Sequence, residues 1–221
     1  MDRARYTAPR PGRPRHTPDR SQVPAREQIL DAAAKLFTSR GFAGTSTREI
    51  ADEVGIRQAS LYYHFTGKDA ILAELMEMTV RPTLDSLDEL AQIATNDARL
   101  YSLALHDAQT LAELMHNIGI LPTLPDVAQT PECQEYGAAR QQLRQAYGVL
   151  GITCASDSVI STIDKGHLGL MIIQQVEGVV RDRVSGHVFT TMELHAVAAT
   201  CLRICGVAED RVMAAARTCV L

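Results

Sequence analysis

The residues best suited to bind a charged partner lie in one short stretch, RQASLYYH, at residues 57–64. It places an arginine, an amide, a hydroxyl, two phenols and an imidazole side by side. Burying so many polar groups is costly unless each one finds a hydrogen-bond partner. We therefore expect most of these side chains to face a partner outside the chain.

The residues before this stretch predict two helices. The first begins near Pro24, ends at Gly41 and has an apolar face at the spacing i, i+4, i+7 and i+8, formed by Ile29, Ala33, Leu36 and Phe37. Ser46-Thr-Arg-Glu49 is a capping box, which opens a second, short helix that ends at Gly55.

A third short helix contains the stretch itself, with Leu61 and Phe65 as its inward pair. Two short helices joined by a glycine-containing turn form a helix-turn-helix. The small, amide and hydroxyl side chains suit base edges in the major groove of DNA, and tyrosine and histidine suit phosphate oxygens. In the alternative interpretation, Tyr62 or Tyr63 packs against the first helix and His64 is merely exposed.

The distribution of charge supports a polyanionic partner for the N-terminal part. Residues 1–70 hold 12 Lys and Arg against 8 Asp and Glu, whereas the rest of the chain holds 10 against 18. A basic front on an acidic body indicates that only the front meets nucleic acid.

Residues 1–23 contain six arginines and four prolines and almost no apolar residue, which predicts a disordered basic arm. Its RPGRPR motif at residues 10–15 resembles an AT-hook, in which Arg13 and Arg15 would enter the minor groove of A·T-rich DNA. The alternative is an unspecific basic tail held near phosphates by charge. In either case the arm should strengthen DNA binding.

Cysteine content and hydropathy limit the class of protein. The five cysteines have no CxxC spacing, which disfavours a disulfide framework and fits a cytoplasmic protein. No apolar run approaches the length that crosses a membrane, and the basic N-terminus lacks the apolar core of a secretory signal.

Beyond the helix-turn-helix, the chain is expected to be all-α. A fourth helix over 68–79 turns Ile71, Leu72, Leu75 and Met76 inward. Further helices are predicted at 83–95, 97–117, 131–149, 156–183, 190–205 and 208–219. The expected organisation is the arm (1–23), a helix-turn-helix domain (24–67) and a ligand-binding and dimerisation domain (68–221).

Residues 26–75 resemble the DNA-binding domain of the TetR family of bacterial regulators. The matching positions include Leu36-Phe37, Gly41-Phe42, Thr45-Ser46, Arg48-Glu-Ile50-Ala51, Val54-Gly55, Leu61-Tyr-Tyr-His-Phe65, Lys68 and Leu72. The resemblance implies an all-α homodimer whose DNA-binding heads are joined by helix four to ligand-binding bodies. It also implies that the last two long helices pair across the dimer.

The resemblance further implies roles for single residues. Thr47, Arg48 and Lys68 would lie near phosphates. Gln58, Ala59 and Ser60 would face bases, and Tyr62, Tyr63 and His64 would divide between core, base and phosphate. The family usually has Ser or Thr where this chain has Arg57. Either the helix cap is lost or Arg57 itself reaches a guanine or a phosphate.

The body has no motif of a catalytic or metal site, so we expect no enzyme, no cofactor and no metal. A pocket with an apolar lining and a few polar anchors is the better interpretation, although each residue alone is more often core. The candidates are Tyr101, Leu105, Met115, His116, Tyr136, Tyr147, His167, Met171 and Gln174.

A dimer interface is expected on 156–183 and 190–205. An apolar stripe recurs at helical spacing along Leu194, Val197, Ala198, Cys201, Leu202 and Cys205. The alternative is that this stripe packs inside its own subunit. We interpret Cys201 and Cys205, four residues apart, as small core residues; the alternative is that they begin a metal site.

These features predict a cytoplasmic, homodimeric repressor that binds double-stranded operator DNA and is released by a small, largely apolar effector. Three rivals remain open. One is an activator or ligand-independent regulator on the same fold. The others are an enzyme that uses the body His and Cys residues and a pure interaction module.

Overall fold

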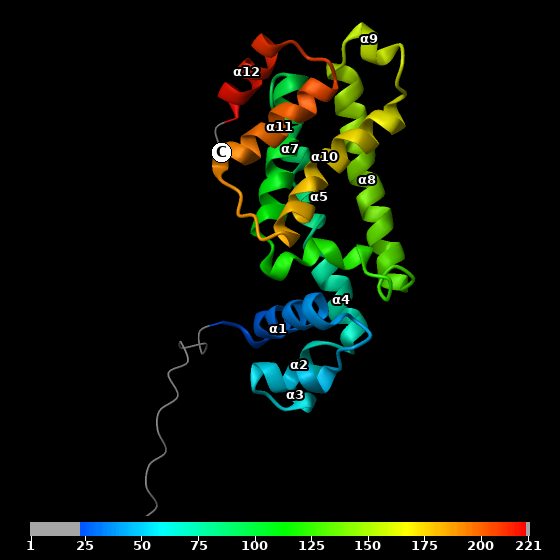
Figure 1. Ribbon diagram of the computed structural model, residues 1–221, viewed down its shortest axis with the longest axis vertical. Coiled ribbons are helices and arrows are strands. Elements are labelled where there is room, and N and C mark those ends of the chain that lie inside the picture. The colour runs from blue at the N-terminus through cyan, green and yellow to red at the C-terminus, as the bar shows by residue number, and fades with distance from the viewer. Residues whose placement is uncertain (1–22, 220–221) are drawn as a thin grey trace, which may run out of the picture.

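The computed structural model describes residues 23–219, and all regular structure in that range is helical. A small head lies at one end of an elongated body, and α4 joins the two (Figure 1). The predicted arm, with Arg13 and Arg15, lies outside the described residues. Within 23–219, no helix is both long enough and apolar enough to span a membrane.

The head consists of α1 (Ala25–Arg40), α2 (Thr47–Val54) and α3 (Gln58–His64). The predicted capping box is confirmed, because the Ser46 side chain accepts from the Glu49 amide and the Glu49 carboxylate accepts from the Ser46 amide. Gly55 ends α2 at φ 83°, a left-handed conformation that glycine adopts without strain.

The three helices close over one small core. Ile29 and Phe37 from α1, Ile50 from α2 and Leu61 from α3 are all fully buried. The predicted inward faces of α1 and α3 are therefore confirmed. α4 (Lys68–Glu77) leaves this core with its predicted inward residues, Ile71 to Met76, buried against both head and body.

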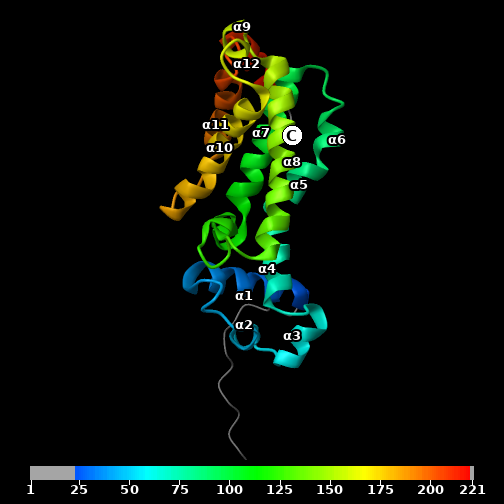
Figure 2. The ribbon, with the colours of Figure 1, turned by 90° about the vertical axis from the view of Figure 1, so that its right-hand side faces the viewer.

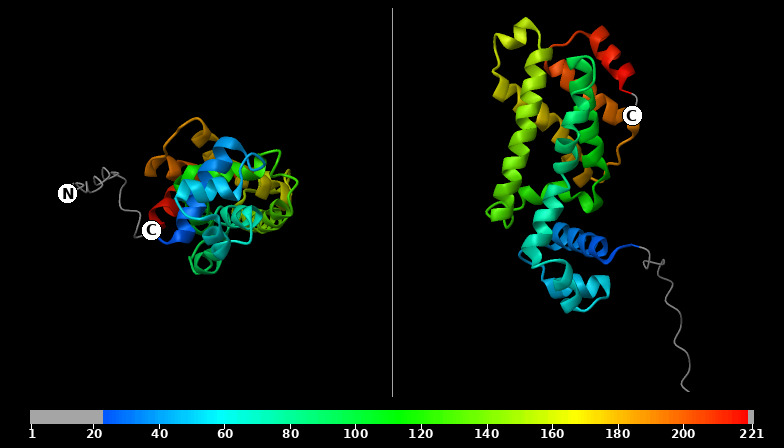
Figure 3. Two further views of the ribbon diagram at one scale, coloured as in Figure 1. Left: turned by 90° about the horizontal axis from the view of Figure 1, so that it is seen from below. Right: turned by 180° about the vertical axis from the view of Figure 1, so that it is seen from behind.

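The body contains eight further α-helices and one 3-10 segment within the described range. They are α5 (Arg81–Asp85), α6 (Leu87–Leu90), α7 (Asn96–Glu113), η2 (Met115–Thr123), α8 (Pro131–Cys154), α9 (Asp157–Ile160), α10 (Lys165–Val184), α11 (Thr191–Ile204) and α12 (Glu209–Thr218). α7, α8 and α10 run along the body (Figure 2), and α7 lies at its centre, in contact with α8, α10, α11 and α12 (Figure 3).

Two predicted helices are broken in the structure. The expected helix 83–95 is two short helices followed by a turn, and Thr95 then caps α7. The expected helix 156–183 is α9 and α10, because the Asp164 side chain accepts hydrogen bonds from the amides of Gly166 and His167. Asp164 thus starts a new helix inside the predicted one. Ser86, which separates α5 from α6, donates its hydroxyl to the Thr83 carbonyl.

The expected helix 97–117 ends four residues early, at Glu113. His116 and Asn117 follow with φ of 48° and 53°, which is an uncommon conformation for residues other than glycine. The Arg183 guanidinium stabilises this kink by donating to the carbonyls of Leu111 (2.9 Å) and Leu114 (2.6 Å) and to Asn117 Oδ1. The polypeptide therefore turns from α7 into η2 under the control of a residue on α10.

The apolar stripe assigned to a dimer interface lies inside its own subunit. Five of its six members, Leu194, Ala198, Cys201, Leu202 and Cys205, are buried within this chain, and Val197 is half-buried. α11 turns this side toward α7. The amphipathic pattern was correctly recognised, but its partner is a helix of the same chain.

A charged residue on this stripe should therefore unfold the body. Ala198 is fully buried, whereas Ala214 on α12 is exposed. We expect Ala198→Glu to lower the free energy of unfolding by at least about 3 kcal/mol, and Ala214→Glu to change it by less than about 0.5 kcal/mol. Urea denaturation followed by circular dichroism compares the two variants. Equal stability would show that the stripe is not core.

Candidate functional site: a DNA-binding head and a body cavity

The predicted contact residues of α3 form one exposed face at the free end of the molecule (Figure 1). Tyr63 is 87% exposed and Tyr62 is 50% exposed, whereas Leu61 between α3 and the core is fully buried. Gln58, Ala59 and Ser60 are also exposed. Neither tyrosine is buried against α1, so the alternative interpretation of these residues does not hold.

A polar cluster sets the position of α3 against α2. The Gln58 side-chain amide donates to Thr47 Oγ1 at 2.9 Å, and the Tyr62 hydroxyl lies 3.2 Å from the same oxygen. The His64 ring packs edge-on against Tyr63, with 5.3 Å between ring centroids. Thr47 is therefore the residue through which α2 and the exposed face of α3 are held together.

Arg57 occupies the N-cap position of α3 without a side-chain hydrogen bond to the helix. The side-chain cap of α3 is therefore absent, as the first of the two interpretations of Arg57 predicted. Arg57 and Arg48 are both exposed on the head, and Arg48 lies 4.0 Å from Asp52 on the same helix. One guanidinium thus lies near the start of α2 and the other directly before α3.

Lys68 has a different role from the expected phosphate contact. Its ammonium donates to the carbonyls of Phe42 (2.9 Å) and Thr45 (3.1 Å) and lies 4.3 Å from the centre of the Phe42 ring. These bonds join the start of α4 to the loop between α1 and α2. Lys68 therefore stabilises the junction of head and body.

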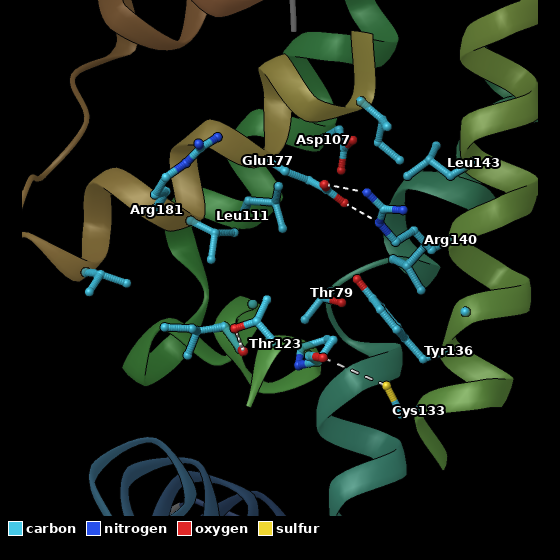
Figure 4. A pocket seen from close by; sticks show the side chains of 18 residues that line it. Thr79, Asp107, Leu111, Thr123, Cys133, Tyr136, Arg140, Leu143, Glu177 and Arg181 are labelled. Atoms are coloured by element: carbon cyan, nitrogen blue, oxygen red, sulfur yellow. Dashed lines mark hydrogen bonds and ion pairs between the residues drawn. The ribbon is translucent and has the colours of Figure 1, made fainter. Parts of the chain in front are cut away.

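The body contains a cavity of about 550 Å³ between α4, α7, η2, α8 and α10 (Figure 4). Most of its wall is apolar. The lining residues are Thr79, Val80, Asp107, Leu111, Gly119, Ile120, Pro122, Thr123, Cys133, Tyr136, Gly137, Arg140, Leu143, Ile173, Glu177, Val180, Arg181 and Val184. The size and lining are those of a small-molecule site.

Of the nine predicted pocket residues, only Tyr136 lies on this wall. Three are buried elsewhere in the core: Tyr101, Leu105 and Tyr147. Two lie at the start of η2, where the backbone kinks: Met115 and His116. Three lie on the outer side of α10, exposed or half-buried: His167, Met171 and Gln174. Helical periodicity identifies a helix face but not which neighbour that face meets, so these assignments did not locate the cavity.

The charged residues of the cavity were missed. Arg140 on α8 donates to both oxygens of Glu177 on α10, at 2.5 Å and 2.6 Å, and Figure 4 shows this pair beside Asp107. The available signal was a charged residue inside an otherwise apolar helix face, as for Asp107 in the segment LALHDA. Such residues are seldom buried without a specific partner.

Asp107 is fully buried and connects three helices. The Tyr147 hydroxyl of α8 donates to its Oδ2 at 2.7 Å, and the Thr83 hydroxyl of α5 lies 3.2 Å from its Oδ1. Burial raises the pKa of Asp107 to about 7, and the charge of Glu177 acts in the same direction. The bonds from Tyr147 and Thr83 and the charge of Arg140 oppose this shift only in part.

Comparison with known proteins identifies the chain. Residues 29–75 match the profile of the bacterial regulatory proteins of the tetR family. The crystal structure of AmtR from Mycobacterium smegmatis superimposes with a TM-score of 0.77, at 34% identity over 91% of this chain and 97% of AmtR. This chain belongs to the TetR family.

This TetR-family chain is also similar, over part of its length, to curated repressors. It is 45% identical over 51 residues to the transcriptional repressor KstR2 of Rhodococcus jostii, and 34% identical over 93 residues to the biofilm-operon regulator IcaR of Staphylococcus aureus. The matches span 25% and 47% of those proteins. The chain is a transcriptional regulator with a DNA-binding helix-turn-helix, and not an enzyme.

The exposed face of α3 predicts two classes of variant. Tyr63→Ala should weaken DNA binding with little change in base preference, because a phosphate contact positions the protein without reading sequence. Gln58→Ala should change the preferred bases. Binding-site selection with each purified variant measures both effects. An unaltered preference for Gln58→Ala would remove that residue from the readout.

Asp107 predicts a pH-dependent contribution to stability. Its pKa is raised from 3.8 to about 7, so the folded state holds the proton more tightly than the unfolded state. The stabilisation is present below about pH 4 and is lost as pH rises toward 7. Relative to Asp107→Asn, the free energy of unfolding of the wild type should fall by roughly 2–4 kcal/mol between pH 4 and 8. Urea denaturation at several pH values measures this. The same pH dependence of the free energy of unfolding in both proteins would contradict the prediction.

Proposed function

We propose that this TetR-family protein is a homodimeric repressor that leaves its operator when a small, largely apolar molecule occupies the body cavity. The observation that carries the proposal is that η2 forms part of the cavity wall and also contacts the head. A ligand that changes the position of η2 would change the position of the DNA-binding helices.

On its cavity side, η2 contributes Gly119, Ile120, Pro122 and Thr123 to the wall. Asn117 attaches it to α10 by donating to the Val180 carbonyl at 3.0 Å. A Cβ atom on Gly119 would lie only 2.7 Å from a methyl of Val180, so the two segments are in very close contact. A ligand or a larger side chain inserted between these two segments must therefore move η2 or α10.

On its head side, the same segment contacts α1 and the loop that follows it. The His116 ring lies 2.9 Å from the Asp31 carboxylate of α1. Asp126, just after η2, accepts a hydrogen bond from the Ala43 amide at 2.6 Å. The predicted role of His116 as a pocket residue is thus replaced by a role at the junction of head and body.

The proposed homodimer uses the outer sides of α10 and α11 and the turn between them. Val184, Val188 and Met192 are exposed there, Met192 to 79%. Pairing by a two-fold axis would cover these side chains and place two heads on one DNA duplex. Sedimentation of the full chain tests the dimer.

The names of KstR2 and IcaR, a repressor and a negative regulator, favour repression over activation. Deleting the gene while recording a reporter driven by its own upstream region separates the two possibilities. Higher output supports a repressor, and lower output supports an activator on the same fold.

Gly119 provides a test of the coupling that needs no ligand. Gly119→Val should force η2 away from α10 and lower affinity for a selected operator about tenfold. Gly137→Val is the matched control, because Gly137 also lines the cavity but has open space around its Cβ position. Fluorescence anisotropy on labelled DNA measures both affinities. Equal affinities for the two variants, each folded, would count against the proposed coupling.

A further inference from the structure

We propose that the effector of this cavity is an amphipathic cation. Its protonated amine lies beside Asp107, and its apolar part lies against η2 and α8. This inference rests on the proposed function, since it concerns the ligand of the same site. It follows from how the charged groups of the cavity are already paired.

The charged groups gather on one side of the cavity, where Asp107, Glu177 and Arg140 lie together (Figure 4). Arg181 also lines the cavity, but this residue is exposed to solvent. On this side of the cavity, the two carboxyl groups of Asp107 and Glu177 thus lie near one guanidinium, that of Arg140. When Asp107 is ionised, this side of the cavity carries one uncompensated negative charge.

The Arg140–Glu177 pair is complete without a ligand. Both Glu177 oxygens accept from Arg140, and a bidentate pair of this kind is among the stronger polar contacts in proteins. Asp107 differs, because its two hydrogen-bond partners, Tyr147 and Thr83, are neutral hydroxyls. Asp107 is therefore the carboxylate that lacks a bonded cation.

An anionic ligand fits this arrangement poorly. To reach Arg140 it would have to break the bidentate pair, and it would place a third negative charge beside Asp107 and Glu177. In a medium of low polarity, like charges a few ångströms apart repel strongly. An ammonium group meets the opposite situation, because it compensates Asp107 and leaves the existing pair intact.

The rest of the cavity wall favours an apolar part in the ligand. Leu111, Ile120, Leu143 and Ile173 line the cavity, and burial of a hydrocarbon chain against them contributes about 0.8 kcal/mol per methylene. The Tyr136 hydroxyl is nearby but stays protonated, since burial raises its pKa to about 12. The cavity wall is thus acidic at one end and apolar over the rest.

Binding of an amine should also release a proton. Around neutral pH a fraction of Asp107 is protonated in the free protein, because burial and Glu177 raise its pKa while Arg140, Tyr147 and Thr83 lower it. An ammonium placed beside it favours the carboxylate, and the displaced proton passes to the buffer. Neutral ligands of the same shape would not produce this release.

The test uses octylamine, octanol and octanoate, which share one hydrocarbon tail and differ in the head group. Isothermal titration calorimetry with the full chain at pH 7, in phosphate and in Tris, gives the affinity and the number of protons released. We expect octylamine to bind about tenfold more tightly than octanol or octanoate and to release a fraction of a proton.

Asp107→Asn should reduce octylamine affinity about tenfold and leave octanol affinity unchanged, while exposed Asp85→Asn should change neither. The inference is overturned if octanoate binds most tightly, if octylamine does not bind, or if Asp107→Asn binds octylamine like the wild type. If Asp107→Asn does not fold, the head-group series and proton release with the wild-type protein still decide. Octylamine that binds without affecting operator affinity would refute the proposed function, whereas the assignment of an amphipathic cation as the ligand of this cavity would stand.

Discussion

The contacts of Arg183 with the end of α7 determine how the body meets the head. Its guanidinium satisfies two carbonyls at the helix terminus and holds Asn117, so the polypeptide turns into η2 instead of continuing as α7. η2 then forms one wall of the cavity and lies against α1. If α7 continued as the periodicity alone suggests, neither that wall nor the His116–Asp31 contact would form.

A second set of polar contacts holds the helices around the cavity. Asp107 joins α5, α7 and α8 through Thr83 and Tyr147, and Arg140 joins α8 to α10 through Glu177. Buried polar groups are costly when unpaired, and among the described residues no buried side-chain nitrogen or oxygen lacks a partner. The same groups that order the body thus give one side of the cavity its charge.

The head was largely predictable because its signals are local. The capping box at Ser46, the glycine that ends α2 and the inward pair Leu61 and Phe65 each act within a few residues. The body was not, because the assignments there depended on partners far along the chain. Lys68 illustrates the difference: its type suits a phosphate, but two carbonyls more than twenty residues away already accept from it.

The sequence by itself determined the all-helical class, the helix-turn-helix and the exposed face of α3, since each follows from spacing and local hydrogen bonding. Only the tertiary structure decided which apolar faces meet. It placed the stripe from Leu194 to Cys205 inside the subunit, and it gathered Asp107, Arg140 and Glu177 from three helices around one cavity. Periodicity defines a helix face without naming its neighbour, because any apolar surface of matching shape can bury it.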